Sequence, residues 1–256
     1  MAFLKRNLRN FYTVFFDDGS CKIKFRNLNS QKVILKEYFN TVRPKDGDLF
    51  KSVNEYLKDA KKDKKSYVSV IDGSLKHSLV MENSDDLKDK LTQKIDKNII
   101  AILDEDKFQI YKENIEANEF EYISPFKVLY FLYKNCKLDG VNLFLIKFHQ
   151  TLAVMVASKD KVIDARMISL EESYEKMISE NLDLDINSDE IFCAAIEKYL
   201  KQFYKKHDDF IEKIMVYGSV GPEIGYYIFT KIFIKTEVGM ENIIDFANKI
   251  NIKENF

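Results

Sequence analysis

Two segments of the chain carry the same order of apolar and alternating stretches. The first opens with the apolar run FYTVFF (11–16), turns at DDGS (17–20) and continues with CKIKF (21–25), in which apolar residues alternate with lysines. An apolar run predicts a strand buried on both faces, and alternation predicts a strand with one face in solvent. KVILKEYF (32–39) predicts a third strand, so a three-strand meander is expected here.

The second segment repeats this order in the other half of the chain. NLFLIKF (142–148), TLAVMVA (151–157) and VIDARMI (162–168) predict three strands joined by the short turns HQ and SKDK. Phe16 and Ile146, which occupy corresponding positions, are 130 residues apart (146 − 16 = 130). A degenerate repeat with so long a period indicates a duplicated half-domain.

Helical spacing of apolar residues predicts helices between the strands. One is expected within 46–62, and Ser124-Pro125 predicts the start of another, with serine as N-cap and proline at the first helical position. Ser84 is predicted to cap a helix with Leu87, Leu91 and Ile95 on its apolar face. The other expected elements are strands at 67–71 and 75–82, one or two strands within 98–123, helices within 170–206, and a buried strand that ends at Gly218 before a helix beginning at Pro222.

Composition excludes several classes of function. The 256 residues are 46% apolar and 32% charged, which is typical of a soluble globular chain with one large or two small domains. Forty basic and 41 acidic residues are evenly spread, so no nucleic-acid surface is expected. The three cysteines and three histidines show no metal-ligand spacing, and we expect no metal site. No apolar run reaches the ~18–20 residues that span a bilayer, and MAFLKRNLRN lacks the apolar core of a signal peptide.

The order of these parts resembles the actin-like ATPase superfamily, and within it the PilM family of type IV pilus proteins, with the cytoplasmic domain of GspL secretion proteins as a relative. The resemblance rests on FFDDGSCKIK after a short basic lead, on YVSVIDGS, and on IEKIMVYGSVG. It implies an α/β fold of duplicated ribonuclease H-like halves, each a three-strand meander plus helices, with a small inserted subdomain. The expected boundaries are 10–73 and 123–140 for the first half, 74–122 for the insert, and 141–256 for a shortened second half.

The resemblance also implies a nucleotide site, from which this sequence departs. In the superfamily the first turn of each meander holds phosphate and a late glycine-rich turn receives adenosine. The first turn keeps its polar residues, but the second reads Lys147-Phe148-His149 where the family has Asp-x-Gly, and the late turn keeps half of a glycine pair. A lysine within ~4 Å of a metal would cost on the order of 1–4 kcal/mol per unit charge. We therefore expect a vestigial site without cofactor, formed by Asp17, Gly19, Ser20, Lys147, His149, Gly218 and Ser219.

The function that the resemblance implies is that of a catalytically inactive cytoplasmic scaffold, peripheral at the inner membrane. It would bind the cytoplasmic tail of a single-span inner-membrane protein in an envelope-spanning machine: a type IV pilus, a type II-like secretion system or a flagellar motor with pilus-derived parts. Membrane contact would then be indirect, and self-assembly into a ring stays open. The tail is expected in a groove between the insert and the first half, lined by Leu75, Leu79, Ile99, Ile100, Ile102 and Leu103.

Two alternatives stay open at this point. An active actin-fold ATPase or small-molecule kinase would use ATP and Mg²⁺, with Asp18 or Asp164 as the available metal-binding carboxylate. An α/β interaction protein unrelated to actin would carry the repeat by coincidence. Nucleotide binding separates the scaffold from the enzyme, and the strand order of the two meanders separates both from the third interpretation.

Overall fold

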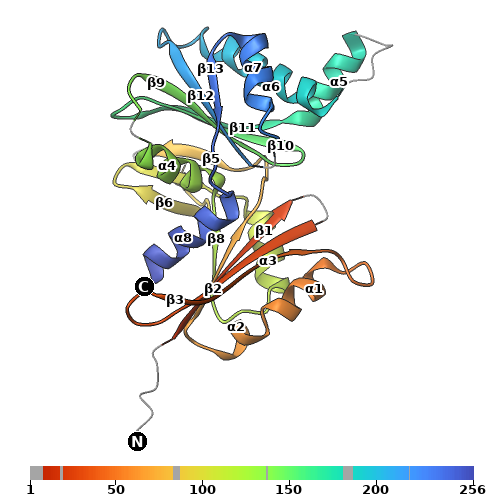
Figure 1. Cartoon of the computed structure of the whole chain (residues 1–256), viewed down its shortest axis with the longest axis vertical. Coiled ribbons are helices and arrows are strands. Elements are labelled where there is room, and N and C mark those ends of the chain that lie inside the picture. Colours follow the sequence, from red (N-terminus) through yellow and green to blue (C-terminus); the bar gives the residue numbers. More distant parts are fainter. Residues whose placement is uncertain (1–7, 18–19, 83–86, 137, 181–186, 219) are drawn as a thin grey trace, which may run out of the picture. The chain divides into compact units, whose positions relative to one another are not determined.

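The chain folds into two compact units (Figure 1). The computed structural model describes residues 8–17, 20–82, 87–136, 138–180, 187–218 and 220–256. The first unit comprises Met1–Asp72, Leu103–Ser124 and Asn242–Phe256, and the second comprises Gly73–Ile102 and Pro125–Glu241.

A five-stranded sheet with the order β3-β2-β1-β4-β8 forms the centre of the first unit. β1 (Arg9–Asp17), β2 (Ser20–Leu28) and β3 (Ile34–Val42) form an antiparallel meander. β4 (Ser66–Ile71) and β8 (Phe120–Ile123) extend the sheet parallel to β1. The predicted meander is therefore confirmed, with its apolar first strand at the centre of the sheet.

Three helices of the first unit lie between its strands in sequence. α1 (Leu49–Tyr56) and α2 (Lys58–Lys62) replace the single helix expected within 46–62, and α3 (Glu105–Asn114) is an additional helix within 98–123, where one or two strands were expected. Carboxylates cap two of these helices: Asp48 accepts a hydrogen bond from Lys51 N, and Asp104 accepts one from Lys107 N. Such caps satisfy amide groups that a helix leaves unpaired at its start.

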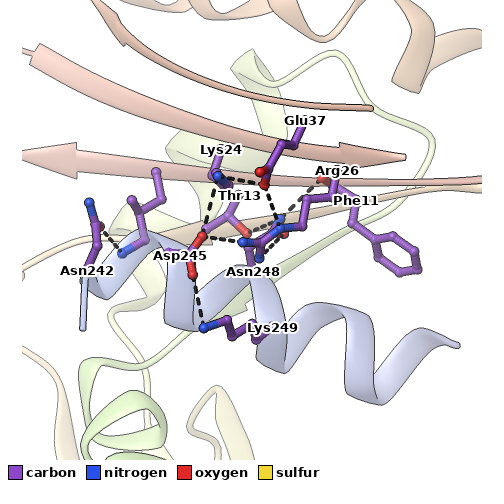
Figure 2. A network of polar contacts seen from close by, with 10 residues as sticks. Phe11, Thr13, Lys24, Arg26, Glu37, Asn242, Asp245, Asn248 and Lys249 are labelled. Carbon is purple, nitrogen blue, oxygen red and sulfur yellow. Dashed lines mark hydrogen bonds and ion pairs between the residues drawn. The ribbon is translucent and has the colours of Figure 1, made fainter. Parts of the chain in front are cut away.

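The fourth helix, α8 (Ile243–Asn255), packs against β1, β2 and β4. Figure 2 shows how its polar side chains meet the sheet. Asn248 is fully buried; its Nδ2 donates to Phe11 O (3.2 Å) and Thr13 Oγ1 (3.1 Å), and its Oδ1 accepts from Arg26 Nη1 (3.3 Å). Asp245 pairs with the same guanidinium. A segment more than 200 residues from β1 in sequence thus completes the first unit through buried polar contacts.

The second unit contains an eight-stranded sheet with the order β13-β12-β9-β10-β11-β5-β7-β6. β9 (Val141–Lys147), β10 (Thr151–Ala157) and β11 (Val162–Ser169) form the second antiparallel meander. β12 (Ile211–Gly218) and β13 (Lys235–Val238) follow in parallel with β9. The order β11-β10-β9-β12-β13 repeats β3-β2-β1-β4-β8, so the predicted duplication is confirmed.

The described residues of the second unit form the helices α4 (Pro125–Asn135), α5 (Leu170–Glu180), α6 (Ser188–Phe203) and α7 (Ile224–Ile232). The predicted start at Pro125 is confirmed. A capping box at Asn187 begins α6, whose residues Phe192, Ile196 and Tyr199 are buried in a core with the inward residues of β9, β10 and β12. This core fixes the ends of β9 and β12, where two of the predicted site residues lie.

Three short strands continue the second sheet: β5 (Ser78–Met81), β6 (Thr92–Asp96) and β7 (Ile99–Ile102). The helix expected on Leu87, Leu91 and Ile95 is wrong, because Ile95 lies in β6, whose backbone pairs with β7. Its predicted cap, Ser84, lies outside the described residues. The boundaries also differ from those expected: 73–102 belongs to the second unit, 103–124 to the first, α4 to the second and α8 to the first.

Candidate functional site

The first candidate loop lies in the first unit, at the turn between β1 and β2. Asp17 and Ser20 face each other at the ends of these strands, and Ser20 Oγ donates a hydrogen bond to Asp17 O (2.9 Å). Asp18 and Gly19 lie outside the described residues. The structure thus brings two of the predicted residues together, and the serine hydroxyl closes the turn in the way that such turns commonly use it.

The second candidate loop lies in the second unit, between β9 and β10. Phe148 N donates to Thr151 O (2.9 Å), so this amide is used within the turn itself. The Phe148 ring is buried against Gly73, where an added Cβ would lie 2.6 Å from Phe148 Cγ. Thr151 Oγ1 donates to Gly73 O (2.6 Å), and His149 is exposed. The turn is therefore packed by a side chain and fastened to the segment that follows β4.

Lys147 ends β9 and extends toward the start of α6. Its Nζ donates to Ser188 Oγ (3.5 Å) and lies 5.7 Å from the centre of the Phe192 ring. Asp189 and Glu190 in the first turn of α6 give this helix start a negative charge. An ammonium group in this place disfavours a divalent cation, because like charges repel at short range.

Gly218, at the end of β12, lies directly beside Lys147 in the parallel pair β9–β12. Its φ is +109°, and an added Cβ would lie 2.3 Å from Lys147 O. Close backbone approach and a left-handed φ are two reasons why only glycine suits this position. The structure therefore joins two predicted site residues of the second unit, while Ser219 lies outside the described residues.

Of the two carboxylates named for the enzymatic alternative, Asp18 lies outside the described residues and Asp164 already has partners. Asp164 on β11 accepts from Tyr199 Oη (2.7 Å) and pairs with Arg166 (3.0 Å). Burial and the Asp164 charge raise the pKa of Tyr199 far above its usual range, so the phenol stays a donor. Within the described part of the chain, no group of three or more His, Cys, Asp or Glu side chains is arranged to hold a metal ion.

Sequence reasoning missed a buried carboxylate at the end of β4. Asp72 is 5% exposed and accepts from Tyr111 Oη (2.5 Å) and Tyr122 Oη (2.8 Å). Burial, followed by the charge of Asp72, raises the pKa of both phenols far above their usual range. Asp72-Gly73-Ser74 repeats the Asp-Gly-Ser of the first turn, and that repetition was the available signal. The carboxylate here anchors α3 and β8 to β4.

The six residues expected to line a partner groove have different environments. Leu75 is 49% exposed, whereas Ile102 and Leu103 are buried in the second and first unit respectively. Ile100 is half-buried in β7. Leu79 and Ile99 line a groove of about 190 Å³ together with residues of β11.

The strand orders and the duplicated meanders define an actin-like fold. The chain is similar to a Bacteroides thetaiotaomicron protein with actin-like ATPase fold and unknown function, at a TM-score of 0.62 and 11% identity over 97% of this chain and 98% of that one. It is similar to a chain of the PilM-PilN type IV pilus biogenesis complex, at a TM-score of 0.53 and 10% identity over 96% of each chain. For MreB5 of Spiroplasma citri bound to ADP, the TM-score is 0.51 and the identity 12%, over 96% of this chain and 97% of that one.

Sequence comparisons cover less of the chain. Residues 174–256 match the model of a domain of unknown function, DUF8341. No curated protein matches the chain. Among the described residues, no helix is long and apolar enough to cross a membrane.

Proposed function

We propose that this chain is a catalytically inactive actin-like scaffold that binds the cytoplasmic tail of a single-span inner-membrane protein. The actin-like fold and the likeness to a chain of the PilM-PilN complex support this proposal. The protein would lie in the cytoplasm at the inner membrane, in a type IV pilus, a type II-like secretion system or a flagellar motor with pilus-derived parts. Its membrane contact would be through the partner, and we propose that copies of the chain assemble into a ring.

The observation that carries the inactive part of the proposal is the β9–β10 turn. A phosphate loop needs backbone amides that point at the ligand, and a carboxylate that holds Mg²⁺. Here Phe148 N is bonded to Thr151 O, the Phe148 ring packs on Gly73, and Lys147 at the end of β9 places a cation near the start of α6. Each of these three features opposes a bound nucleotide with Mg²⁺.

Calorimetry with ATP and Mg²⁺ tests this part. We expect no binding tighter than ~0.1 mM, which corresponds to roughly 5.5 kcal/mol, and no ATP hydrolysis. Tighter binding by the unmodified chain would contradict the proposal and favour the active ATPase or kinase, for which MreB5 bound to ADP offers a precedent in the same fold. The double change Lys147→Asp with His149→Gly should restore some binding if these residues are the obstacle.

Membrane association tests the partner. The protein is expected to sediment with inner membranes in cells that contain its single-span partner and to become soluble in cells that lack it. Purification from solubilised membranes should bring one such protein along. If the chain stays with the membrane in cells without any such candidate, the indirect-contact proposal is wrong.

A further inference from the structure

The second sheet is split between β11 and β5. Within the described residues a single register pair, Arg166–Ser78, joins the two strands. Beyond that pair the antiparallel strands diverge, with Leu79–Met81 on one side and Ile163–Ala165 on the other. We call this opening the fork; its lining consists of Leu79, Val80, Met81, Ile99, Val162, Ile163, Asp164 and Ala165.

Both walls of the fork are strand edges. β7 pairs with the other edge of β5, and β10 pairs with the other edge of β11. The edges that face the fork therefore carry backbone N–H and C=O groups outside any ladder that the described residues form. Such edges are templates for an added strand. The chemistry of both walls is thus suited to a polypeptide main chain.

The dimensions of the fork restrict what can enter. Its volume of about 190 Å³ is roughly that of six liquid water molecules. An α-helix with its side chains is ~10–12 Å across and does not fit. Because strands of this chain flank the opening on both sides, the edge of a folded sheet in a second copy cannot reach in. A short extended segment that is not part of a sheet is narrower than a helix and can enter between the two strands.

The side chains of the fork indicate the polarity of that segment. Seven of its eight lining residues are apolar, and the eighth, Asp164, is engaged by Arg166 and Tyr199. Met81 is 55% exposed at the mouth, and Leu79, Val80 and Ile163 are half-buried. A charged side chain would lose hydration here without gaining a partner. Apolar side chains would gain by burial.

We infer that the fork binds a short, extended, apolar segment of the partner, which enters between β5 and β11 as an added strand. This inference rests on the proposed function, since it assigns the place where the partner's cytoplasmic tail docks. Main-chain hydrogen bonds to one or both edges supply the affinity, and the apolar pocket selects the side chain that points into it.

Site-specific photo-crosslinking in the full chain tests the assignment. The probe is p-benzoylphenylalanine placed at Met81 in the fork, with Met240 (97% exposed, same unit) as the matched control and Phe39 on β3 as a second site. The crosslinked peptides are sequenced. We expect the probe at Met81 to label an apolar stretch in the cytoplasmic tail of a single-span protein, and the probe at Met240 not to label it.

A synthetic peptide with the labelled stretch then gives the affinity by fluorescence anisotropy. Met81→Lys should weaken its binding by about tenfold or more, because an apolar segment bound in the fork would cover the ammonium at the mouth and remove its water, whereas Met240→Lys should change it less than about twofold because that side chain stays in water. In hydrogen exchange, residues 79–81 and 163–165 should become protected by the peptide, and the edge strand β13 should not.

The remaining outcomes overturn the inference in distinguishable ways. If the probe at Met81 labels a second copy, lipid or nothing, the fork does not hold a partner tail. If Phe39 but not Met81 labels the single-span protein, the proposed function stands and the fork assignment fails. If no single-span protein is labelled from any position and none co-purifies, the proposed function fails together with the fork.

Discussion

Replacing Asn248 by alanine should destabilise the first unit strongly, although asparagine is a residue that most often lies at the protein surface. The side chain is fully buried and bonds three groups of the sheet: Phe11 O, Thr13 Oγ1 and Arg26 Nη1 (Figure 2). Asn248→Ala removes all three bonds. It leaves a main-chain carbonyl and part of a guanidinium buried without this partner.

The expected loss follows from these bonds. A neutral hydrogen bond contributes about 1 kcal/mol and one to a charged group about 1.5–3 kcal/mol, so the simple sum is roughly 3.5–5 kcal/mol. Thr13 keeps Ser69 Oγ (2.7 Å), and Arg26 keeps Glu37 (3.2 Å) and Asp245. These remaining contacts reduce the cost, and we expect the free energy of unfolding to fall by about 3 kcal/mol.

Lys249→Ala is the matched control, one residue further along the same helix. The Lys249 side chain is 60% exposed and its Nζ lies 3.2 Å from Asp245. An exposed ion pair contributes less than about 1 kcal/mol, so this variant should remain close to the unmodified chain. Both variants remove a polar side chain from α8, and they differ in whether that side chain is buried in the unmodified chain.

Urea denaturation followed by circular dichroism gives the loss of stability, and hydrogen exchange of β1 shows whether it arises in the first unit. We expect faster exchange at Phe11–Thr13 in Asn248→Ala only. A loss below about 1 kcal/mol, or equal losses in the two variants, would refute the view that buried amide contacts attach α8 to the sheet.

Two further predictions concern pH and a glycine. Burial raises the pKa of Asp245, but Lys249, Arg26 and Lys24 outweigh it and hold the pKa below its usual range. The stability that the Asp245 carboxylate contributes should therefore be complete above about pH 4 and fall as the pH drops through the folded pKa. When stability is measured against pH, Asp245→Asn should lack this acid-dependent fall. An acid profile equal to that of the unmodified chain would contradict the prediction. Gly218→Ala should destabilise the second unit by about 2 kcal/mol or more, because its φ is strained for alanine and its Cβ meets Lys147 O. The control Gly225→Ala, inside α7 with its nearest Cβ contact at 3.4 Å, should be neutral or stabilising, and equal melting of both variants would count against this explanation.

Local patterns were sufficient for the two meanders. Apolar runs, alternation and short polar turns gave β1–β3 and β9–β11, because each strand's burial on one or both faces leaves a period in the residues themselves. The repeat then predicted the duplicated fold. Lys147 and Gly218 were both selected from sequence, but only the β9–β12 register shows that they are direct neighbours.

Local patterns failed where the choice depended on a distant partner. Leu87, Leu91 and Ile95 fit a helix by spacing, yet β6 is a strand because β7 offers it a hydrogen-bonding edge. The strands expected within 98–123 are β7 and β8, but α3 between them was not predicted, and its buried Tyr111 is held by Asp72, 39 residues away in sequence. Neither the β7 edge nor the Asp72 carboxylate can be recognised from the residues adjacent in sequence to β6 or α3.

The sequence by itself therefore determined the two meanders, the duplicated architecture and the residues of the turn between the first two strands of the second meander. Only the tertiary structure decided that Asn248 and Asn251 are buried, that α8 belongs to the first unit, and that β5 leaves β11 after one pair. The physical reason is the range of the interactions involved. The periodicity of a strand can be recognised from adjacent residues. In contrast, an asparagine that bonds a carbonyl more than 200 positions away cannot be distinguished in sequence from one that faces water.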